Sequence, residues 1–133
     1  MRYLLDTNTC IDYLRYPQSP VRQRLAQHSP EEVALCTIVK AELYYGAYRS
    51  ADPQANLQLL AQFFQPFVCL PYDDRSAEIY GSIRAALASQ GLMIGPHDLL
   101  IASVAVAHRL ILVTSNWREF QRIAGLSWED WTQ

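Results

Sequence analysis

The chain has 133 residues, of which half are hydrophobic and 18% are charged, and its formal net charge at pH 7 is −2. These values predict a single globular domain over residues 1–133 and exclude both a disordered chain and a broad basic surface for nucleic acid. No apolar run reaches the length of a membrane span, and the first residues lack a signal-peptide pattern, so we expect no membrane anchor or secretion leader.

The basic residues indicate which partners the chain could bind, and the cysteines indicate the redox environment in which it works. Ten of the eleven cations are Arg, whose forked guanidinium suits phosphate, so local phosphate contacts stay open beside the interpretation as solvated surface arginines. Cys10, Cys36 and Cys69 are dispersed in apolar surroundings without a CxxC pair. Such cysteines are typical of buried, reduced thiols in a cytoplasmic protein rather than of disulfides or zinc ligands.

Hydrophobic runs, helix caps and breaks divide the chain into alternating strands and helices. Ser19, Thr37, Asp52 and Asp73 are predicted helix caps, and Gly91 is predicted to end a helix. In chain order, the predicted elements are a strand over 2–5, helices over 7–15 and 20–28, a strand over 32–36, helices over 38–49 and 54–64, a strand over 67–70, helices over 74–89 and 95–108, a strand over 110–114, a short helix over 117–123 and a fifth strand within 127–131.

Continuous apolar strands separated by helices predict an α/β fold, with a central, mostly parallel sheet of four to five strands and helices on both faces. In such sheets ligands bind beyond the carboxyl ends of the strands. Asp6 follows the first strand, and Thr114, Ser115 and Asn116 follow the fourth. We therefore expect the functional site at these strand ends.

Three carboxylates occupy unusual positions on apolar elements. Asp6 precedes a helix and Asp98 lies in the first turn of the most apolar helix, so each is also explained by helix capping alone. Glu42 falls on the stripe formed by Ile38, Val39, Leu43 and Gly46, where a lone carboxylate is costly to bury. Its structural alternative is an ion pair with Lys40 or with an Arg from elsewhere in the chain.

The three acids cannot come together without compensation. Carboxylates about 4 Å apart repel by roughly 4 kcal/mol per pair at an effective dielectric constant near 20. Three such pairs give about 12 kcal/mol, which is comparable with the whole stability of a small domain, about 5–15 kcal/mol. The acids must therefore stay apart, hold protons or share a cation. An oxygen site suits Mg²⁺ or Mn²⁺, whereas the three histidines lack the spacing of zinc ligands.

The sequence resembles the PIN-domain ribonucleases of the VapC toxin type, which belong to type II toxin–antitoxin (VapBC) systems. The resemblance is carried by "YLLDTNTCIDYLR", "IVKAELYYGA" and "GLMIGPHDLLIASVAVAHRLILVTSNWREFQRIAGLSWEDW", in the order of that family and over nearly the full chain. It implies a three-layer α/β/α PIN-like sandwich and an endoribonuclease that depends on Mg²⁺ or Mn²⁺. By matching motif, Asp6, Glu42 and Asp98 take the places of the family's acidic residues.

The fourth family position, often acidic, falls at Asn116. Asn brings no charge, although it can donate to phosphate or hold a water molecule. Glu119 can supply the missing carboxylate if its turn is helical; the alternative is a surface acid beside Arg118 or Arg122. Because the fourth carboxylate is missing from its usual position, a site with one metal ion and a site with two remain as alternatives.

The mechanism that we predict is metal-assisted hydrolysis of an RNA phosphodiester bond. Asp6 and Asp98 are the expected metal ligands, and Glu42 is expected to bind through water or to act as the base. Thr7, Asn8 and Ser115 are expected to hold the scissile phosphate or nearby waters. His97 can touch a substrate phosphate, or it is an ordinary surface histidine.

The resemblance also implies a VapB-type antitoxin, which would lay an apolar or aromatic segment along a groove and point an Arg at the acids, and it implies a homodimer. The block "AELYYGA" is similar to toxins that cut structured RNA, so tRNA is the favoured substrate. Tyr44, Tyr45 and Tyr48 are explained either as a surface for stacking RNA bases or as a packing or dimer surface.

Two other functions compete with this prediction. Transfer through an aspartyl-phosphate is disfavoured because position 8 is Asn rather than a second Asp, and because the only lysine, Lys40, does not follow a late strand. A PIN-like module that binds RNA or a protein without cleavage is kept open by Asn116. The cost of three acids on apolar faces favours the enzyme.

Overall fold

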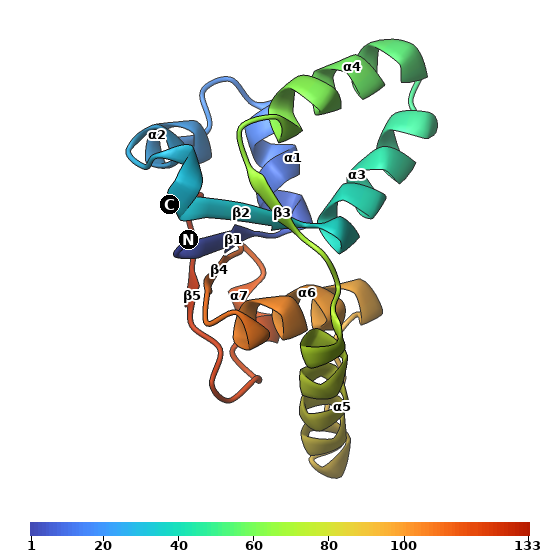
Figure 1. Cartoon of the computed structure of the whole chain (residues 1–133), viewed down its shortest axis with the longest axis vertical. Coiled ribbons are helices and arrows are strands. Elements are labelled where there is room, and N and C mark those ends of the chain that lie inside the picture. Colours follow the sequence, from blue (N-terminus) through green and yellow to red (C-terminus); the bar gives the residue numbers. More distant parts are fainter.

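A five-stranded, fully parallel sheet lies between two groups of helices in the computed structural model, which describes residues 1–133 (Figure 1). In chain order the elements are β1 (Tyr3–Leu5), α1 (Thr7–Arg15), α2 (Pro20–Ala26), the 3-10 helix η1 (Pro30–Glu32), β2 (Val33–Cys36), α3 (Thr37–Tyr48), α4 (Pro53–Phe64), β3 (Val68–Leu70), α5 (Asp74–Ser89), α6 (Pro96–Ala107), β4 (Ile111–Val113), α7 (Trp117–Phe120) and β5 (Trp128–Glu129).

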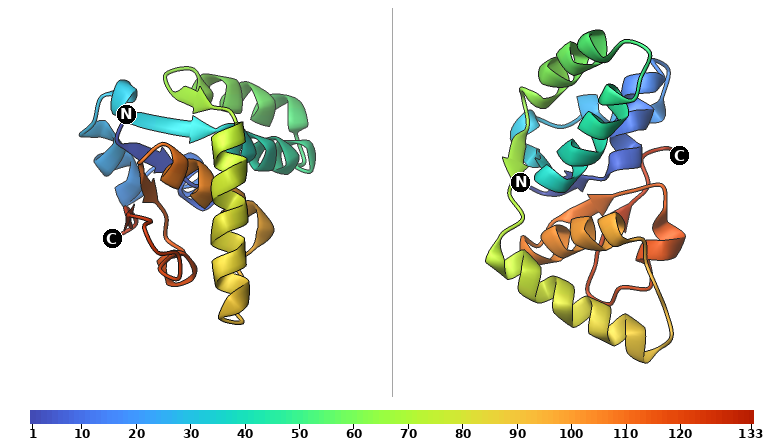
Figure 2. Two further views of the ribbon diagram at one scale, coloured as in Figure 1. Left: turned by 60° about the horizontal axis from the view of Figure 1, so that its bottom comes forward. Right: turned by 90° about the vertical axis from the view of Figure 1, so that its right-hand side faces the viewer.

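The helices cover both faces of the sheet. Helices α1, α3 and α4 lie on one side, and α5 and α6 lie on the other, with the strands between the two groups in the right-hand view of Figure 2. Parallel strands require such crossover helices, and burial on both faces explains why their sequences are continuously apolar. Leu4, Leu5 and all four residues of β2 are fully buried. The α/β prediction is therefore confirmed.

The strand order is β3-β2-β1-β4-β5. From β1 the chain first moves outward through β2 and β3, and then returns to place β4 on the other side of β1. Tyr3 is paired with both Val33 of β2 and Ile111 of β4. The order thus reverses between β1 and β4, and a crevice forms at such a switch point beyond the carboxyl ends of the strands.

The element boundaries agree with the sequence patterns to within one residue, apart from the ends of two helices. Helix α2 ends at Ala26 rather than near residue 28, and α7 ends at Phe120 rather than Ile123. Thr37 is the first residue of α3, and Cys36 occupies the cap position without a side-chain hydrogen bond, so the cap predicted at Thr37 is wrong. Gly91 follows α5 with φ +69°, a left-handed conformation that glycine adopts without strain.

The core joins the two helical layers through the sheet. Helix α6, the most apolar helix in the sequence, supplies seven buried residues, more than any other helix. Cys10 and Cys36 are buried free thiols, and Cys69 is half-buried and free. None of the helices is long and apolar enough to cross a membrane.

Candidate active site

Asp6 lies where β1 ends and α1 begins. Its backbone N–H donates to the Val113 carbonyl at the end of β4, at 3.0 Å, so the ends of the two central strands are joined here. Its carboxylate accepts the Thr9 backbone N–H at 2.8 Å and caps α1. The side chain is almost inaccessible, and burial raises its pKa. Asp6 is therefore both a helix cap and a buried acid at the switch point.

Glu42 reaches the same region from α3. Its Oε1 accepts a short hydrogen bond from the Thr7 hydroxyl, and its Oε2 lies 3.0 Å from Nδ1 of His97. The structural alternative, an ion pair with Lys40, does not form, because the Lys40 ammonium lies over the Phe64 ring, 4.8 Å from its centroid. Glu42 is thus oriented by Thr7 of α1 and His97 of α6 rather than by a Lys or Arg side chain.

The stripe on which Glu42 was placed is only partly buried. Val39, Leu43 and Ala47 are the buried residues of α3, whereas Gly46 is exposed and Ile38 is half-buried. Glu42 therefore lies at the margin of the buried side of α3, with 27% of its side chain exposed, and can reach solvent and substrate.

Asp98 lies in the first turn of α6. Its pKa is raised to about 6, first by burial and then by the negative charges of Glu119, Asp6 and Glu42, while Asn116 opposes the rise. Nδ2 of Asn116 donates to Oδ2 of Asp98 at 3.4 Å. Beyond the effect of burial, the raised pKa reflects electrostatic repulsion between Asp98 and three carboxylates from other segments of the chain.

Asn116 and Glu119 form a bridge between α7 and the start of α6. Asn116 donates to Oε2 of Glu119 at 2.7 Å, and Oε1 of Glu119 accepts the Gly95 backbone N–H. Glu119 forms no ion pair with Arg118 or Arg122, and Arg122 instead donates to the Met93 carbonyl at 2.8 Å. The alternative of a surface acid paired with these arginines is therefore wrong.

Three polar residues predicted at the site have different environments. The Thr7 hydroxyl is engaged by Glu42. Asn8 is exposed and lines a cavity beside Glu42, whereas Ser115 is exposed in a separate hollow of about 330 Å³ with Asn116 and Arg118. Neither the Asn8 nor the Ser115 side chain is bonded to the acids, so both remain free to meet a substrate.

His97 is the residue whose contact the sequence reasoning missed. Its position beside Asp98 was the available signal, but the contact with Glu42 requires α3 and α6 to approach one another, and no local pattern reports that approach.

The carboxylates converge without forming a closed metal cage. No three His, Cys, Asp or Glu side chains lie close enough to enclose one ion. No Lys or Arg forms an ion pair with any of the four acids, because the ion pair of Glu42 is with His97 and the others in the chain lie elsewhere. The uncompensated, all-oxygen donor set fits a hard cation such as Mg²⁺ or Mn²⁺, which keeps several of its waters.

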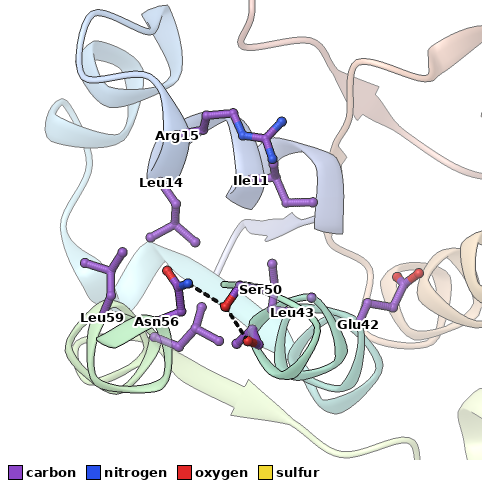
Figure 3. A pocket seen from close by; sticks show the side chains of 11 residues that line it. Ile11, Leu14, Arg15, Glu42, Leu43, Ser50, Asn56 and Leu59 are labelled. Carbon is purple, nitrogen blue, oxygen red and sulfur yellow. Dashed lines mark hydrogen bonds between the residues drawn. The ribbon is translucent and has the colours of Figure 1, made fainter. Parts of the chain in front are cut away.

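Two hollows flank Glu42. One is an apolar groove of about 310 Å³ between α1, α3 and α4, lined by side chains that include Leu14, Leu43 and Leu59. Figure 3 shows Glu42 at the edge of this groove, pointing away from it toward α6. The other is a cavity of about 520 Å³ between α1, α3 and α6.

The comparisons with known proteins agree with this architecture. The PIN domain family model matches residues 3–126. A tRNA(fMet)-specific endonuclease VapC from Salmonella typhimurium is 38% identical over 98% of both chains, and Ribonuclease VapC2 from Haemophilus influenzae is 36% identical over 98% of both.

Solved structures show the same fold. The chain is similar to the DNA-bound VapBC of Salmonella typhimurium, with a TM-score of 0.94 and 38% identity over 98% of both chains. It is also similar to VapBC-1 of nontypeable Haemophilus influenzae, with a TM-score of 0.90 and 32% identity over the whole of both chains. The chain belongs to the PIN-domain family and is a ribonuclease toxin of the VapC type.

Proposed function

We propose that the chain hydrolyses RNA phosphodiester bonds with Mg²⁺, or alternatively Mn²⁺, held by Asp6 and Asp98 directly and by Glu42 through water. The observation that supports this most directly is geometric: Asp98 and Glu119 share the amide of Asn116, at 3.4 Å and 2.7 Å, and Asp6 is buried at the end of β1. Burial and the nearby acids raise the pKa of Asp98 to about 6, in keeping with this crowding. Crowded carboxylates whose only basic contact is His97 on Glu42 create a strong demand for a cation. When bound, the ion supplies Lewis-acid polarisation of the phosphoryl group and a more acidic water.

The protein's own residues orient the general base, accept the proton of the attacking water and contact the phosphate. The Thr7 hydroxyl and Nδ1 of His97 fix the two oxygens of Glu42, which holds that carboxylate between α1 and the first turn of α6, the helix that carries Asp98. From there Glu42 takes the proton of the attacking water as a general base. Asn8 and Ser115 donate to the phosphate oxygens. In-line attack forms the new P–O bond as the P–O3′ bond breaks, and the leaving 3′ oxygen takes a proton from solvent, which gives a 3′-hydroxyl and a 5′-phosphate.

The contacts of Asn116 and Glu119 favour a positioning role. Asn116 stands between two acids with an amide that donates to both, and Glu119 holds the Gly95 amide in front of α6. Together they fix where α6 begins and hence where Asp98 lies. We propose Glu119 as a support of the site and a metal ligand only through water.

The substrate and partners follow from the relatives. A relative bears the name tRNA(fMet)-specific endonuclease, so we propose initiator tRNA as the substrate. Solved relatives are described as VapBC assemblies, so we propose a VapB-type antitoxin whose apolar segment occupies the groove along Leu14, Leu43 and Leu59. An antitoxin Arg that follows this segment reaches Glu42 at the edge of the groove and competes with the metal. A homodimer is also expected, to be tested by measuring the mass in solution.

The test is end-mapped cleavage of total cellular RNA by the purified, antitoxin-free protein, with Mg²⁺, with Mn²⁺ and with EDTA. Asp6→Asn keeps the shape and the acceptor for Thr9, so it should fold normally and lose cleavage. Glu78→Gln, an exposed acid on α5 far from the site, is the matched control and should cleave normally. Intact RNA in every lane, from folded and metal-binding protein, would refute hydrolysis in favour of a binding module.

A further inference from the structure

A cavity of about 520 Å³ between α1, α3 and α6 opens beside the proposed catalytic carboxylate Glu42. Thr7 and Glu42, which belong to the carboxylate cluster, also line this cavity, and Ile11, Ile38 and Leu100 give it apolar walls. Its volume falls within the range of about 300–1,000 Å³ that small-ligand sites occupy. The cavity is therefore large enough for a nucleobase, and it adjoins the place where the scissile phosphate is expected.

Two aromatic rings at this cavity are unusually accessible. Tyr45 on α3 is 64% exposed, and the His97 side chain at the start of α6 is 61% exposed. The contact between Nδ1 of His97 and Glu42, at 3.0 Å, holds the imidazole ring at the cavity. Exposed aromatic faces stack on unpaired bases with about 1–3 kcal/mol per base, and do so with little regard to sequence. Together the rings and the apolar walls match the flat faces of a base.

A cation stands at the outer side of Tyr45. Nη1 of Arg49 donates to the Tyr45 hydroxyl at 3.2 Å, and the guanidinium lies 5.5 Å from the ring centroid. Arg49 has no carboxylate partner. Glu42, Tyr45 and Arg49 are spaced by three and four residues, so they share one side of α3 and span about 10 Å along it. An RNA strand whose scissile phosphate lies near Glu42 would therefore reach first the ring of Tyr45 and then the guanidinium of Arg49.

We propose that this cavity binds the base of one unpaired nucleotide next to the scissile phosphate, with the base against Tyr45 and His97 and a neighbouring phosphate on Arg49. This inference rests on the proposed RNA hydrolysis. A base held in a duplex cannot enter the cavity without leaving its stack, whereas loop bases are free to do so. The cavity would thereby select cleavage within loops or bulges and disfavour paired stems.

The test is a binding experiment in which the RNA and the protein are altered together. Full-length Asp6→Asn protein with Mg²⁺ is titrated into fluorescently labelled hairpins that carry, one at a time, the stem-loop sequences of an initiator tRNA. In a series of hairpins, one loop base at a time is replaced by an abasic nucleotide. Anisotropy gives the dissociation constants for this background alone, and for the same background with Tyr45→Ala, Tyr45→Phe or Tyr48→Ala. Tyr48 lies on the same helix, is 66% exposed and does not line the cavity.

Removal of one loop base is expected to weaken binding by about 5- to 150-fold, the equivalent of one stacked base. That loss should disappear with Tyr45→Ala and persist with Tyr45→Phe and Tyr48→Ala. Equal affinity for all hairpins, including no binding by any, or an undiminished loss with Tyr45→Ala, overturns the proposal. Cleavage of the intact hairpin by the unsubstituted protein is scored separately: base-selective binding without cleavage refutes the hydrolysis, and cleavage without base selectivity refutes the base site.

Discussion

Replacing Asp98 by Asn is expected to make the metal-free protein more stable at neutral pH. The pKa of Asp98 is raised from 3.8 to about 6 by burial and by neighbouring acids, so the folded state binds a proton at this site that the unfolded chain has already lost. A group with a raised pKa contributes its full stability below pH 3.8, and that contribution is lost as pH rises through about 6. Above that pH the ionised Asp98 carboxylate lowers the stability of the folded protein, and the neutral Asn side chain does not.

The size of the gain follows from the shift. About two pKa units correspond to roughly 3 kcal/mol, and solvent screening of a half-buried group reduces this to about 1–2 kcal/mol. Urea unfolding with EDTA, at intervals from pH 5 to pH 7.5, measures it. The midpoint for Asp98→Asn should exceed that of the unsubstituted protein by about 0.5–1 M urea at pH 7.5 and approach it at pH 5.

Metal gives the reverse experiment. Mg²⁺ should stabilise the unsubstituted protein at pH 7.5, stabilise it less at pH 5, where Asp98 is protonated, and act weakly on Asp98→Asn. Glu78→Gln should show none of these differences. A variant that is no more stable than the unsubstituted protein at pH 7.5, or a gain that does not change with pH, would refute the electrostatic reasoning.

Three further substitutions probe the site and the fold. Asn116→Asp adds a carboxylate beside Asp98 and Glu119. Without metal, this substitution should lower the free energy of unfolding at pH 7.5 by about 1 kcal/mol at a typical effective dielectric, while calorimetry should show tighter Mg²⁺ binding. No change in either the stability or the Mg²⁺ affinity would contradict the crowding of acids. Leu112→Ala, at a fully buried position of β4, should lower the free energy of unfolding by about 2–5 kcal/mol in urea denaturation, and a loss below 1 kcal/mol would mean that the strand is not held in the core. Gly91→Ala should cost about 1–2 kcal/mol because φ is +69° there, although no atom within 4 Å obstructs a Cβ; an unchanged thermal midpoint would exclude the left-handed conformation.

Much of the fold could be predicted from local patterns, because those patterns act over a few residues. The bounds of α1 agree with the prediction, and Asp52 and Asp73 cap the helices as expected. The order of the strands could not be predicted, since a continuous apolar run does not specify which neighbour it pairs with. The reversal between β1 and β4 is decided by where the crossover helices pack.

The acidic residues of the candidate site could be picked out from the sequence, but the hydrogen bonds that connect them to other elements could not. Asp6, Glu42 and Asp98 stand out because each is a carboxylate on an apolar element. The contacts of His97 with Glu42, and of Glu119 with Gly95, join elements that are 55 and 24 residues apart in the chain. Only the packing of α6 against its neighbours brings these groups together, so no spacing in the sequence signals them.

The place of β4 beside β1 has a consequence for synthesis of the toxin. The carboxylates and their amide come from positions 6, 42, 98 and 116, and the ends of β1 and β4 meet only when the Asp6 amide finds the Val113 carbonyl. A nascent chain that has emerged only as far as α5 holds two of the acids and no partner strand to align them. These four positions are therefore brought together only after translation has passed Asn116, so the chain gains its carboxylate site close to the end of its synthesis.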